Sequence, residues 1–302
     1  MGKLVLLFPG QGSQFVGMGR SLFDASPVAR RTFEEADAVL NFSLSRMCFE
    51  GPEEQLRQTA NTQPAILTHS VAAFRDLADR FPERLDGAAF AAGHSLGEYS
   101  ANVAAGSLDF ADALRLVRAR GGFMQEAVPA SAGAMAAILG LASVDVETAC
   151  RESAQGEVVE AVNFNSPEQT VIAGHVAAVA RACAACTARG AKRAIRLPVS
   201  APFHSSLMAP AREKMEPMLA AAAFADPKWP IVTNVDAAAE SSGARLRGAL
   251  VRQIDSPVRW VASVELLARE GVDRGLEIGP GNVLAGLYRR IDRNVKVEAC
   301  GG

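Results

Sequence analysis

Short apolar runs alternate along the chain with longer segments of helical periodicity. The runs at residues 4–8 and 87–92 are continuously apolar, which predicts strands buried on both faces. Helical patterns are expected at residues 26–40, 61–78, 97–105 and 109–127, and a further helix to about residue 224. Two more strands are expected at 230–235 and 275–278, with a helix that includes Gln253 between them. This alternation predicts an open, mostly parallel sheet whose site lies at the carboxyl edge of its strands.

The pattern changes between residues 129 and 199. Strands are expected at 134–139, 157–162, 169–173 and 194–199, and helices at 144–154 and 176–189. The order βαββαβ is that of the split, ferredoxin-like unit. We therefore predict a small ferredoxin-like domain at 129–199, inserted into a large α/β domain formed by 1–128 and 200–302.

The segment Gly93-His94-Ser95-Leu96-Gly97 lies between a predicted strand and a predicted helix. Glycines two residues before and after a serine are typical of a nucleophile elbow, where side chains at those positions would collide with the neighbouring strand and helix. Amides at the start of the following helix can stabilise an oxyanion. Ser95 is the candidate nucleophile, and the large domain is expected to be α/β-hydrolase-like.

Composition excludes several other classes of protein. The net charge is −2 over 302 residues, which gives no support for nucleic-acid binding. No apolar run approaches the length of a membrane span, and residues 4–8 run into Pro-Gly without a cleavage site, so we expect a cytoplasmic protein without membrane contact. The glycine-containing loop at 9–14 does not match the dinucleotide-binding fingerprint, since Phe15 stands where that fingerprint needs a glycine.

The five cysteines are scattered and odd in number. Cys183 and Cys186 have redox or metal spacing, but they lie in an alanine-rich helical segment without a second pair. Small buried helix residues are the simpler interpretation. We predict no disulfide and no bound metal.

A serine nucleophile needs a base, and the chain has four histidines. His94 should point away from the adjacent serine, His69 is in mid-helix, and His175 ends a strand of the small domain. His204, in a proline-bounded loop, is the candidate base. Among the acids between the serine and this histidine none follows a strand of the large domain, so we expect a dyad, with a backbone carbonyl orienting the imidazole. Those acids are Asp109, Asp112, Glu126, Asp145 and Glu168.

Arg120 lies at the edge of the apolar face of the helix predicted at 109–127. The helix after Ser95 runs for about ten residues, and Arg120 lies about eleven residues along the helix that returns from Asp109. The two segments have similar lengths, so Arg120 is expected at the level of Ser95. An inward arginine beside a nucleophile can hold an anion, most simply a carboxylate, through two parallel hydrogen bonds. A structural ion pair is the alternative.

Together these residues resemble the malonyl-CoA:acyl carrier protein transacylases, which load malonyl groups for fatty-acid and polyketide synthesis. The resemblance covers nearly the whole chain, and its joint order and spacing make it specific. Its motifs are residues 8–14 (FPGQGSQ), 93–98 (GHSLGE), Arg120, 162–167 (VNFNSP), His204, Gln253 with 257–260 (PVRW), and 277–281 (EIGPG).

The resemblance implies a ping-pong acyl transfer from malonyl-CoA to the phosphopantetheine thiol of an acyl carrier protein. Ser95 would carry the acyl ester, His204 would be the base, and Arg120 would hold the malonyl carboxylate. No cofactor is implied besides the coenzyme A thioester substrate, and we expect a monomer. Further residues implied are the Gln11 and Leu96 amides as oxyanion hole, the Gln253 carbonyl orienting the histidine, and Asn163 in support.

Phe203 before His204 resembles the Phe-His pair of malonyl-selective polyketide domains, which favours malonyl over methylmalonyl. Fatty-acid and polyketide synthesis stay open as pathways. The alternatives are a trans-acting polyketide acyltransferase with another extender preference, a serine thioesterase or hydrolase, and a carrier-docking module without catalysis. Two basic clusters are candidate carrier surfaces, although charge runs are usually solvated faces: Lys192, Arg193 and Arg196, and Arg289, Arg290 and Arg293.

Overall fold

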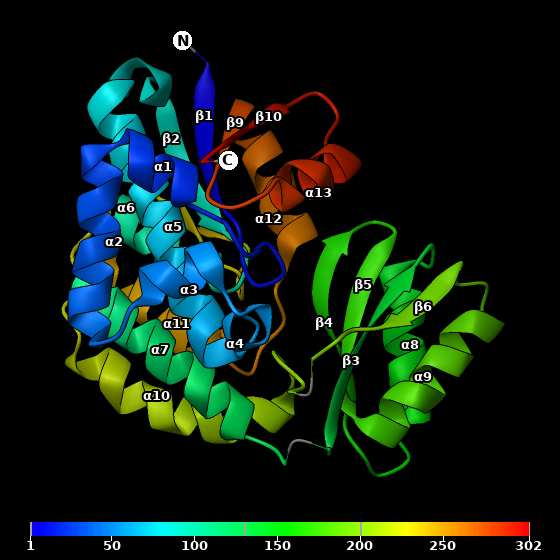
Figure 1. The fold of residues 1–302 in the computed structure, drawn as a ribbon. Coiled ribbons are helices and arrows are strands. Elements are labelled where there is room, and N and C mark those ends of the chain that lie inside the picture. Colours follow the sequence, from blue (N-terminus) through cyan, green and yellow to red (C-terminus); the bar gives the residue numbers. More distant parts are fainter. Residues whose placement is uncertain (1, 130, 200, 302) are drawn as a thin grey trace.

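The computed structural model describes residues 2–129, 131–199 and 201–301, so the predicted domain limit at residue 200 lies outside the described residues. Two sheets organise the chain, and Figure 1 shows them side by side. The larger sheet has the order β10-β9-β1-β2-β7-β8 and the smaller one the order β4-β5-β3-β6. The strands are β1 Lys3–Phe8, β2 Ala88–Gly93, β3 Gly133–Leu139, β4 Val159–Ser166, β5 Gln169–His175, β6 Arg193–Arg196, β7 Ile231–Val232, β8 Ala239–Glu240, β9 Val272–Ile278 and β10 Lys296–Cys300.

Helices cover both faces of the larger sheet and one face of the smaller one (Figure 1). The helices are α1 Arg20–Ala25, α2 Pro27–Leu40, α3 Leu44–Glu50, α4 Glu53–Leu56, α5 Thr59–Arg80, η1 Pro82–Leu85, α6 Gly97–Ala104, α7 Phe110–Glu126, α8 Ser143–Ser153, α9 Val176–Ala188, η2 Ser206–Met208, α10 Ala209–Ala221, α11 Gly243–Arg252, α12 Trp260–Arg269 and α13 Val283–Ile291.

Strand β1 lies in the centre of the larger sheet, parallel to β2 on one side and to β9 on the other. Leu4, Leu6 and Phe8 contribute to one hydrophobic core, whereas Val5 and Leu7 contribute to a second core on the opposite face. This division explains why the strand is apolar throughout. The predicted α/β architecture with a mostly parallel sheet is confirmed.

The edges of the larger sheet differ from the prediction. The strand predicted at 230–235 keeps only Ile231 and Val232, because the chain turns at Thr233, whose amide donates to the Ala238 carbonyl at 3.0 Å. It returns as β8, the one antiparallel strand of this sheet. Strand β10 was not predicted, since its residues are partly or fully exposed and form no apolar run. Helices α3 and α4 were also missed, being too short to show a period.

The smaller sheet is antiparallel, and its strand order confirms the ferredoxin-like pattern. Strand β6 ends at Arg196 rather than at 199. Leu197 still donates its amide to the Met135 carbonyl at 2.9 Å, but Pro198 has no amide to continue the ladder. Strand β4 extends to Ser166, beyond the predicted end at 162.

The two faces of the smaller sheet have different neighbours. Ala134, Ala136 and Ile138 of β3 pack against α8 and α9, whereas Met135 and Ala137 belong to a separate cluster with Phe203. A backbone hydrogen bond joins the smaller sheet to the segment before α12 of the large domain, because Phe164 donates to the carbonyl of Val258 at 3.0 Å. The uncovered face of the smaller sheet is thereby held opposite the carboxyl ends of β1 and β2 (Figure 1).

No helix in the described part of the chain is long and apolar enough to cross a membrane. All five cysteines are free. Within residues 2–129, 131–199 and 201–301, no group of three His, Cys, Asp or Glu side chains could hold a metal ion.

Candidate active site

Ser95 occupies a sharp turn between β2 and α6. Its φ of 52° lies in the left-handed region, which is strained for a serine. A Cβ on Gly93 would stand 2.0 Å from the backbone of Gly97, and a Cβ on Gly97 would stand 2.0 Å from the Phe8 carbonyl oxygen. Both positions therefore require glycine for the steric reason that the sequence suggests. The turn raises the serine hydroxyl at the carboxyl edge of the sheet.

His204 is hydrogen-bonded to this serine. Its Nε2 lies 2.7 Å from Ser95 Oγ, and its Nδ1 lies 2.8 Å from the main-chain oxygen of Gln253. A carbonyl can only accept, so Nδ1 carries the proton and Nε2 is free to accept one. Burial and the neighbouring Arg120 charge lower the pKa of His204 to about 3. The imidazole is therefore neutral near pH 7, as a general base must be.

The five acids considered as orienting groups lie elsewhere. Asp109 caps α7, and Asp145 lies in the first turn of α8. The other three form ion pairs: Asp112 with Arg115, Glu126 with Lys214, and Glu168 with Lys192. In the described residues, no carboxylate is hydrogen-bonded to His204. The arrangement is a serine–histidine pair oriented by a backbone carbonyl.

The other histidines do not contact Ser95 Oγ. His94 lines the same cavity, but its Nε2 lies 2.8 Å from Asn165 Oδ1 and its ring packs against Trp260. His69 is buried in α5, and His175 ends β5. Only His204 is placed to accept the serine proton.

Arg120 extends from α7 to the serine and is 1% exposed. Its Nη2 donates to Ser95 Oγ at 3.2 Å and to Gln253 Oε1 at 2.9 Å, and its Nη1 donates to Gln63 Oε1 at 2.9 Å. Nε has no hydrogen-bond partner among the described residues, and no described carboxylate lies within 4.0 Å. Burial lowers its pKa. A buried guanidinium held by neutral groups is well placed to receive an anion.

The two backbone amides expected to form the oxyanion hole lie beside the serine in the cavity or in the chain, and they have no acceptor among the described residues. Gln11 lies in the loop after β1, and Leu96 directly follows Ser95 at the start of α6. Within the described ranges, neither amide donates to another protein group. Gly10 allows the loop to approach, because a Cβ there would stand 2.3 Å from the His94 carbonyl oxygen. Such a pair of amides can stabilise an oxyanion.

A cavity of about 110 Å³ joins these groups. Asn163 and Phe203, both singled out from the sequence, line it. The side-chain oxygen of Asn163 has no partner in the described part of the chain. The remaining lining residues come from helices α5 and α7, strand β3 and the loops beside them: Gln11, Gln63, His94, Ser95, Arg120, Met124, Met135, Leu197, Val199 and His204.

Sequence reasoning missed three polar residues of this site. Asn234, after β7, accepts from the Ser95 amide at 2.6 Å and donates to the Gly93 carbonyl at 2.7 Å. Its position after a strand at the carboxyl edge was an available signal. Gln63 lies in a helix without a motif, and Glu98 was noted only as part of the elbow motif.

A neutral histidine bonded to a strained serine, with free amides beside it, can form and break a serine ester. Residues 5–300 match the family model described as "Acyl transferase domain". The chain therefore belongs to the acyl transferase domain family.

The individual proteins that the chain resembles have more specific names than the family model. The chain is 52% identical over 291 residues to the malonyl CoA-acyl carrier protein transacylase of Escherichia coli K12, covering 96% of this chain and 93% of the relative. The acyl carrier protein S-malonyltransferase of Vibrio cholerae has a solved structure with a TM-score of 0.95, 48% identity and coverage of 98% and 96%. A malonyl-transacylase solved in complex with a type II PKS acyl-carrier protein gives a TM-score of 0.95, 49% identity and coverage of 98% and 95%.

Proposed function

We propose that this chain is a malonyltransferase that moves a malonyl group from malonyl-CoA to the phosphopantetheine thiol of an acyl carrier protein. The observation that carries the proposal is Arg120, a buried cation without a carboxylate partner in the described residues, 3.2 Å from the serine hydroxyl. A malonyl group brings the missing carboxylate. The names of the relatives support the same substrate and partner.

In the first half-reaction, Ser95 Oγ attacks the thioester carbonyl of malonyl-CoA while His204 Nε2 takes the hydroxyl proton. The Gln11 and Leu96 amides stabilise the tetrahedral oxyanion. The intermediate collapses as the carbon–sulfur bond breaks, and the imidazolium returns its proton to the departing thiolate. The Gln253 carbonyl holds the imidazole in the required tautomer, and a malonyl-serine ester results.

In the second half-reaction, the thiol of the carrier protein attacks this ester. His204 takes the thiol proton and returns it to Ser95 Oγ as the carbon–oxygen bond breaks. A thioester is already activated, so the steps balance with coenzyme A thioester and thiol alone, and the proposal includes no cofactor. A monomeric state and a cytoplasmic location stay predictions.

Phe203 is the proposed basis for choosing malonyl over methylmalonyl, because it lines the cavity beside the reacting serine. Fatty-acid and polyketide pathways use the same chemistry. An acyltransferase with another extender preference is therefore the first alternative, and loading with malonyl-, methylmalonyl- and acetyl-CoA distinguishes it.

A serine thioesterase or hydrolase would share Ser95 and His204 but would have no use for Arg120. Intact-mass measurement after mixing with malonyl-CoA separates the two functions. We expect a stable malonyl adduct that disappears on addition of a holo carrier protein, with the malonyl group found on the carrier. Rapid hydrolysis without a carrier would contradict the proposal.

The carrier surface is tested through the two exposed basic clusters, one at residues 192–196 on the edge strand β6 and the other at residues 289–293 at the end of α13. Acidic carrier proteins would be attracted to a basic surface. Reversing the charge at Arg193 and Arg196 or at Arg289 and Arg290 should weaken transfer at low salt while leaving self-acylation unchanged. Unchanged transfer kinetics would dismiss that cluster.

A further inference from the structure

The mechanism above does not use every buried ionisable residue of the site. Glu98, in the first turn of α6, is fully buried. Its Oε2 accepts from the Asn234 amide and from Gln253 Nε2, both at 2.9 Å. Its Oε1 has no partner among the described residues. A carboxylate left half satisfied in the interior is costly, so a compensating role is expected.

One donor to Glu98 is Gln253, which contacts His204, Arg120 and Ser95. Its main-chain oxygen holds His204, its Oε1 accepts from Arg120, and its Nε2 also donates to the Ser95 carbonyl at 2.9 Å. An amide has a donor end and an acceptor end, and Glu98 can only accept when ionised. The carboxylate therefore fixes which end of Gln253 faces Arg120.

The other contact of Glu98 fixes Asn234. With its backbone amide held by the carboxylate, the Asn234 side chain spans the elbow from the Ser95 amide to the Gly93 carbonyl. These contacts hold Ser95 at its positive φ of 52°. Strained backbone persists only where its surroundings over-determine it.

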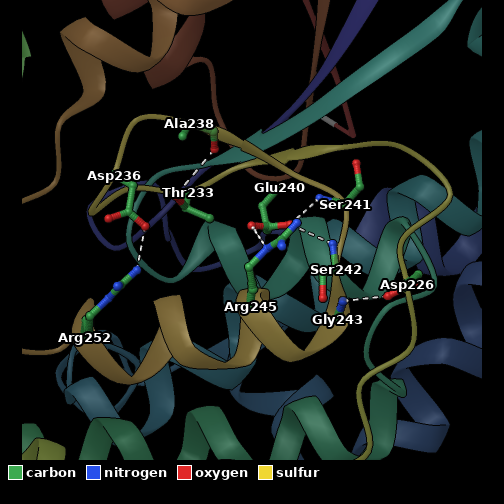
Figure 2. A network of polar contacts seen from close by, with 10 residues as sticks. All are labelled: Asp226, Thr233, Asp236, Ala238, Glu240, Ser241, Ser242, Gly243, Arg245 and Arg252. Atoms are coloured by element: carbon green, nitrogen blue, oxygen red, sulfur yellow. Dashed lines mark hydrogen bonds and ion pairs between the residues drawn. The ribbon is translucent and has the colours of Figure 1, made fainter.

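A second set of contacts joins the same two segments at the surface. Arg252, next to Gln253, pairs with Asp236, two residues after Asn234, at 2.5 Å. Arg245 of α11 pairs with Glu240 of β8 at 2.6 Å. Figure 2 shows both pairs fastening the β7–β8 hairpin to α11. The two surface ion pairs and the buried Glu98 therefore hold the same two segments together, the β7–β8 hairpin and α11 with Gln253.

We propose that Glu98 is a positioning residue for acyl transfer, acting through Gln253 and Asn234 to set His204, Arg120 and the strained Ser95. It touches none of the reacting atoms. The inference rests on the proposed function, since its readout is formation of the malonyl-serine ester.

Ionisation of Glu98 supplies a readout that a purely structural role would not move. Burial raises its pKa to about 7, which Asn234 and Gln253 oppose. In the part of the chain that the structure describes, the charged or titratable groups facing it are Arg120 of α7, Tyr99 of α6 and Asp236 of the β7–β8 turn. A neutral carboxyl accepts hydrogen bonds more weakly than a carboxylate. Acylation should therefore slow as pH falls through about 7, well above the pKa of about 3 of His204.

The experiment measures single-turnover acylation by malonyl-CoA, by rapid quench and intact mass, from about pH 5 to about pH 8. Glu98→Ala should acylate about tenfold to a hundredfold more slowly per folded molecule. Glu98→Gln keeps an acceptor oxygen without the charge. We expect this variant to acylate over the whole pH range at the rate that the unmodified chain shows at low pH, so its pH profile should have no acid limb, that is, no fall in rate as pH falls through about 7.

Glu277→Ala is the matched control, because Glu277 is equally buried and also accepts two hydrogen bonds, in its case from backbone amides of α13. It should lower thermal stability and leave acylation per folded molecule and its pH profile unchanged. Equal losses in the Glu98→Ala and Glu277→Ala variants would overturn the inference. So would acylation by Glu98→Ala within about twofold of normal, or an unchanged limb in Glu98→Gln. Failure of the unmodified chain to form any malonyl adduct would instead reject the proposed function.

Discussion

Two turns at the carboxyl edge of the larger sheet join the same kinds of element, but they differ in backbone strain and in how far their polar groups are hydrogen-bonded. Each leads from a strand to a helix and holds a fully buried glutamate, Glu98 after β2 and Glu277 at the end of β9. In the second turn, both glutamate oxygens accept amides of α13 at 2.9 and 2.7 Å, and glycines take the positive φ angles. In the first turn, a serine takes the positive φ and one glutamate oxygen has no partner in the described residues.

The difference separates stability from function. The β9–α13 turn satisfies its polar groups, as a structural helix cap does. The β2–α6 turn keeps strain and unpaired polar atoms beside a cavity, which is where a substrate can satisfy them. We therefore expect substitutions in the first turn to change activity and those in the second to change stability.

The largest effect is expected for Ser95→Ala. Without the hydroxyl there is no ester, so malonyl-CoA should add no mass to the protein. The variant should unfold at or above the normal temperature, because alanine removes no buried partner that the fold requires. A malonylated adduct in this variant would show that another residue is the nucleophile.

His204→Ala should slow acylation by about a hundredfold to ten-thousandfold. Rapid-quench measurement of the burst with malonyl-CoA tests this expectation. Because the pKa of His204 is lowered to about 3, its loss should not create a new titration between about pH 5 and about pH 8. A burst of normal rate would contradict its role as base.

Glu98→Gln and Glu277→Gln sharpen the comparison through stability. Burial raises the folded-state pKa of Glu98 from 4.5 to about 7, so its contribution to stability is full below about pH 4.5 and is lost as pH rises through 7. Glutamine does not titrate. The unfolding temperature of Glu98→Gln should therefore increase relative to that of the unmodified chain as pH rises from about 5 to about 8.

Glu277→Gln should instead lower the free energy of unfolding by about 1–3 kcal/mol, because one helix amide then faces an amide nitrogen. Its acylation rate should stay normal. Burial raises the pKa of Glu277 as well, so both variants should gain stability relative to the unmodified chain as pH rises, and acylation is what separates the two turns. An equal loss of acylation in both variants would remove the distinction between the two turns.

The smallest effect is expected for Asp236→Asn. The Asp236 charge raises the pKa of Glu98, so removing it should move the acid limb of acylation to lower pH. The exposed pair with Arg252 contributes about 1 kcal/mol or less to stability. A limb that moves to higher pH, measured by single-turnover acylation, would contradict this electrostatic coupling.

Much of the fold could be predicted from the sequence, because buried parallel strands are apolar throughout and the small domain has a complete βαββαβ order. The exposed strand β10 and the two-residue β8 have no such signal. Ser95, His204 and Arg120 could be singled out because elbow glycines, a proline-bounded loop and helix periodicity each place one residue.

Gln63 has no such local signal, and Asn234 has only its position after a strand at the carboxyl edge. Each acts through side-chain contacts between segments far apart in the chain, Gln63 with Arg120 and Asn234 with the turn at Ser95. Local patterns do not encode such pairings. Glu98 was visible in the motif, but its role depends on a burial and a contact with Gln253 that only the folded chain provides.

The most direct test of the account is the ratio of malonyl to acetyl loading in the unmodified chain and in Arg120→Gln. Intact-mass single-turnover rates with malonyl-CoA and acetyl-CoA give this ratio for both proteins. We expect the unmodified chain to prefer malonyl and the variant to lose about tenfold to a hundredfold of that preference, as expected for a charge-assisted pair. An unchanged ratio would show that Arg120 does not hold the substrate carboxylate, and would contradict the central claim.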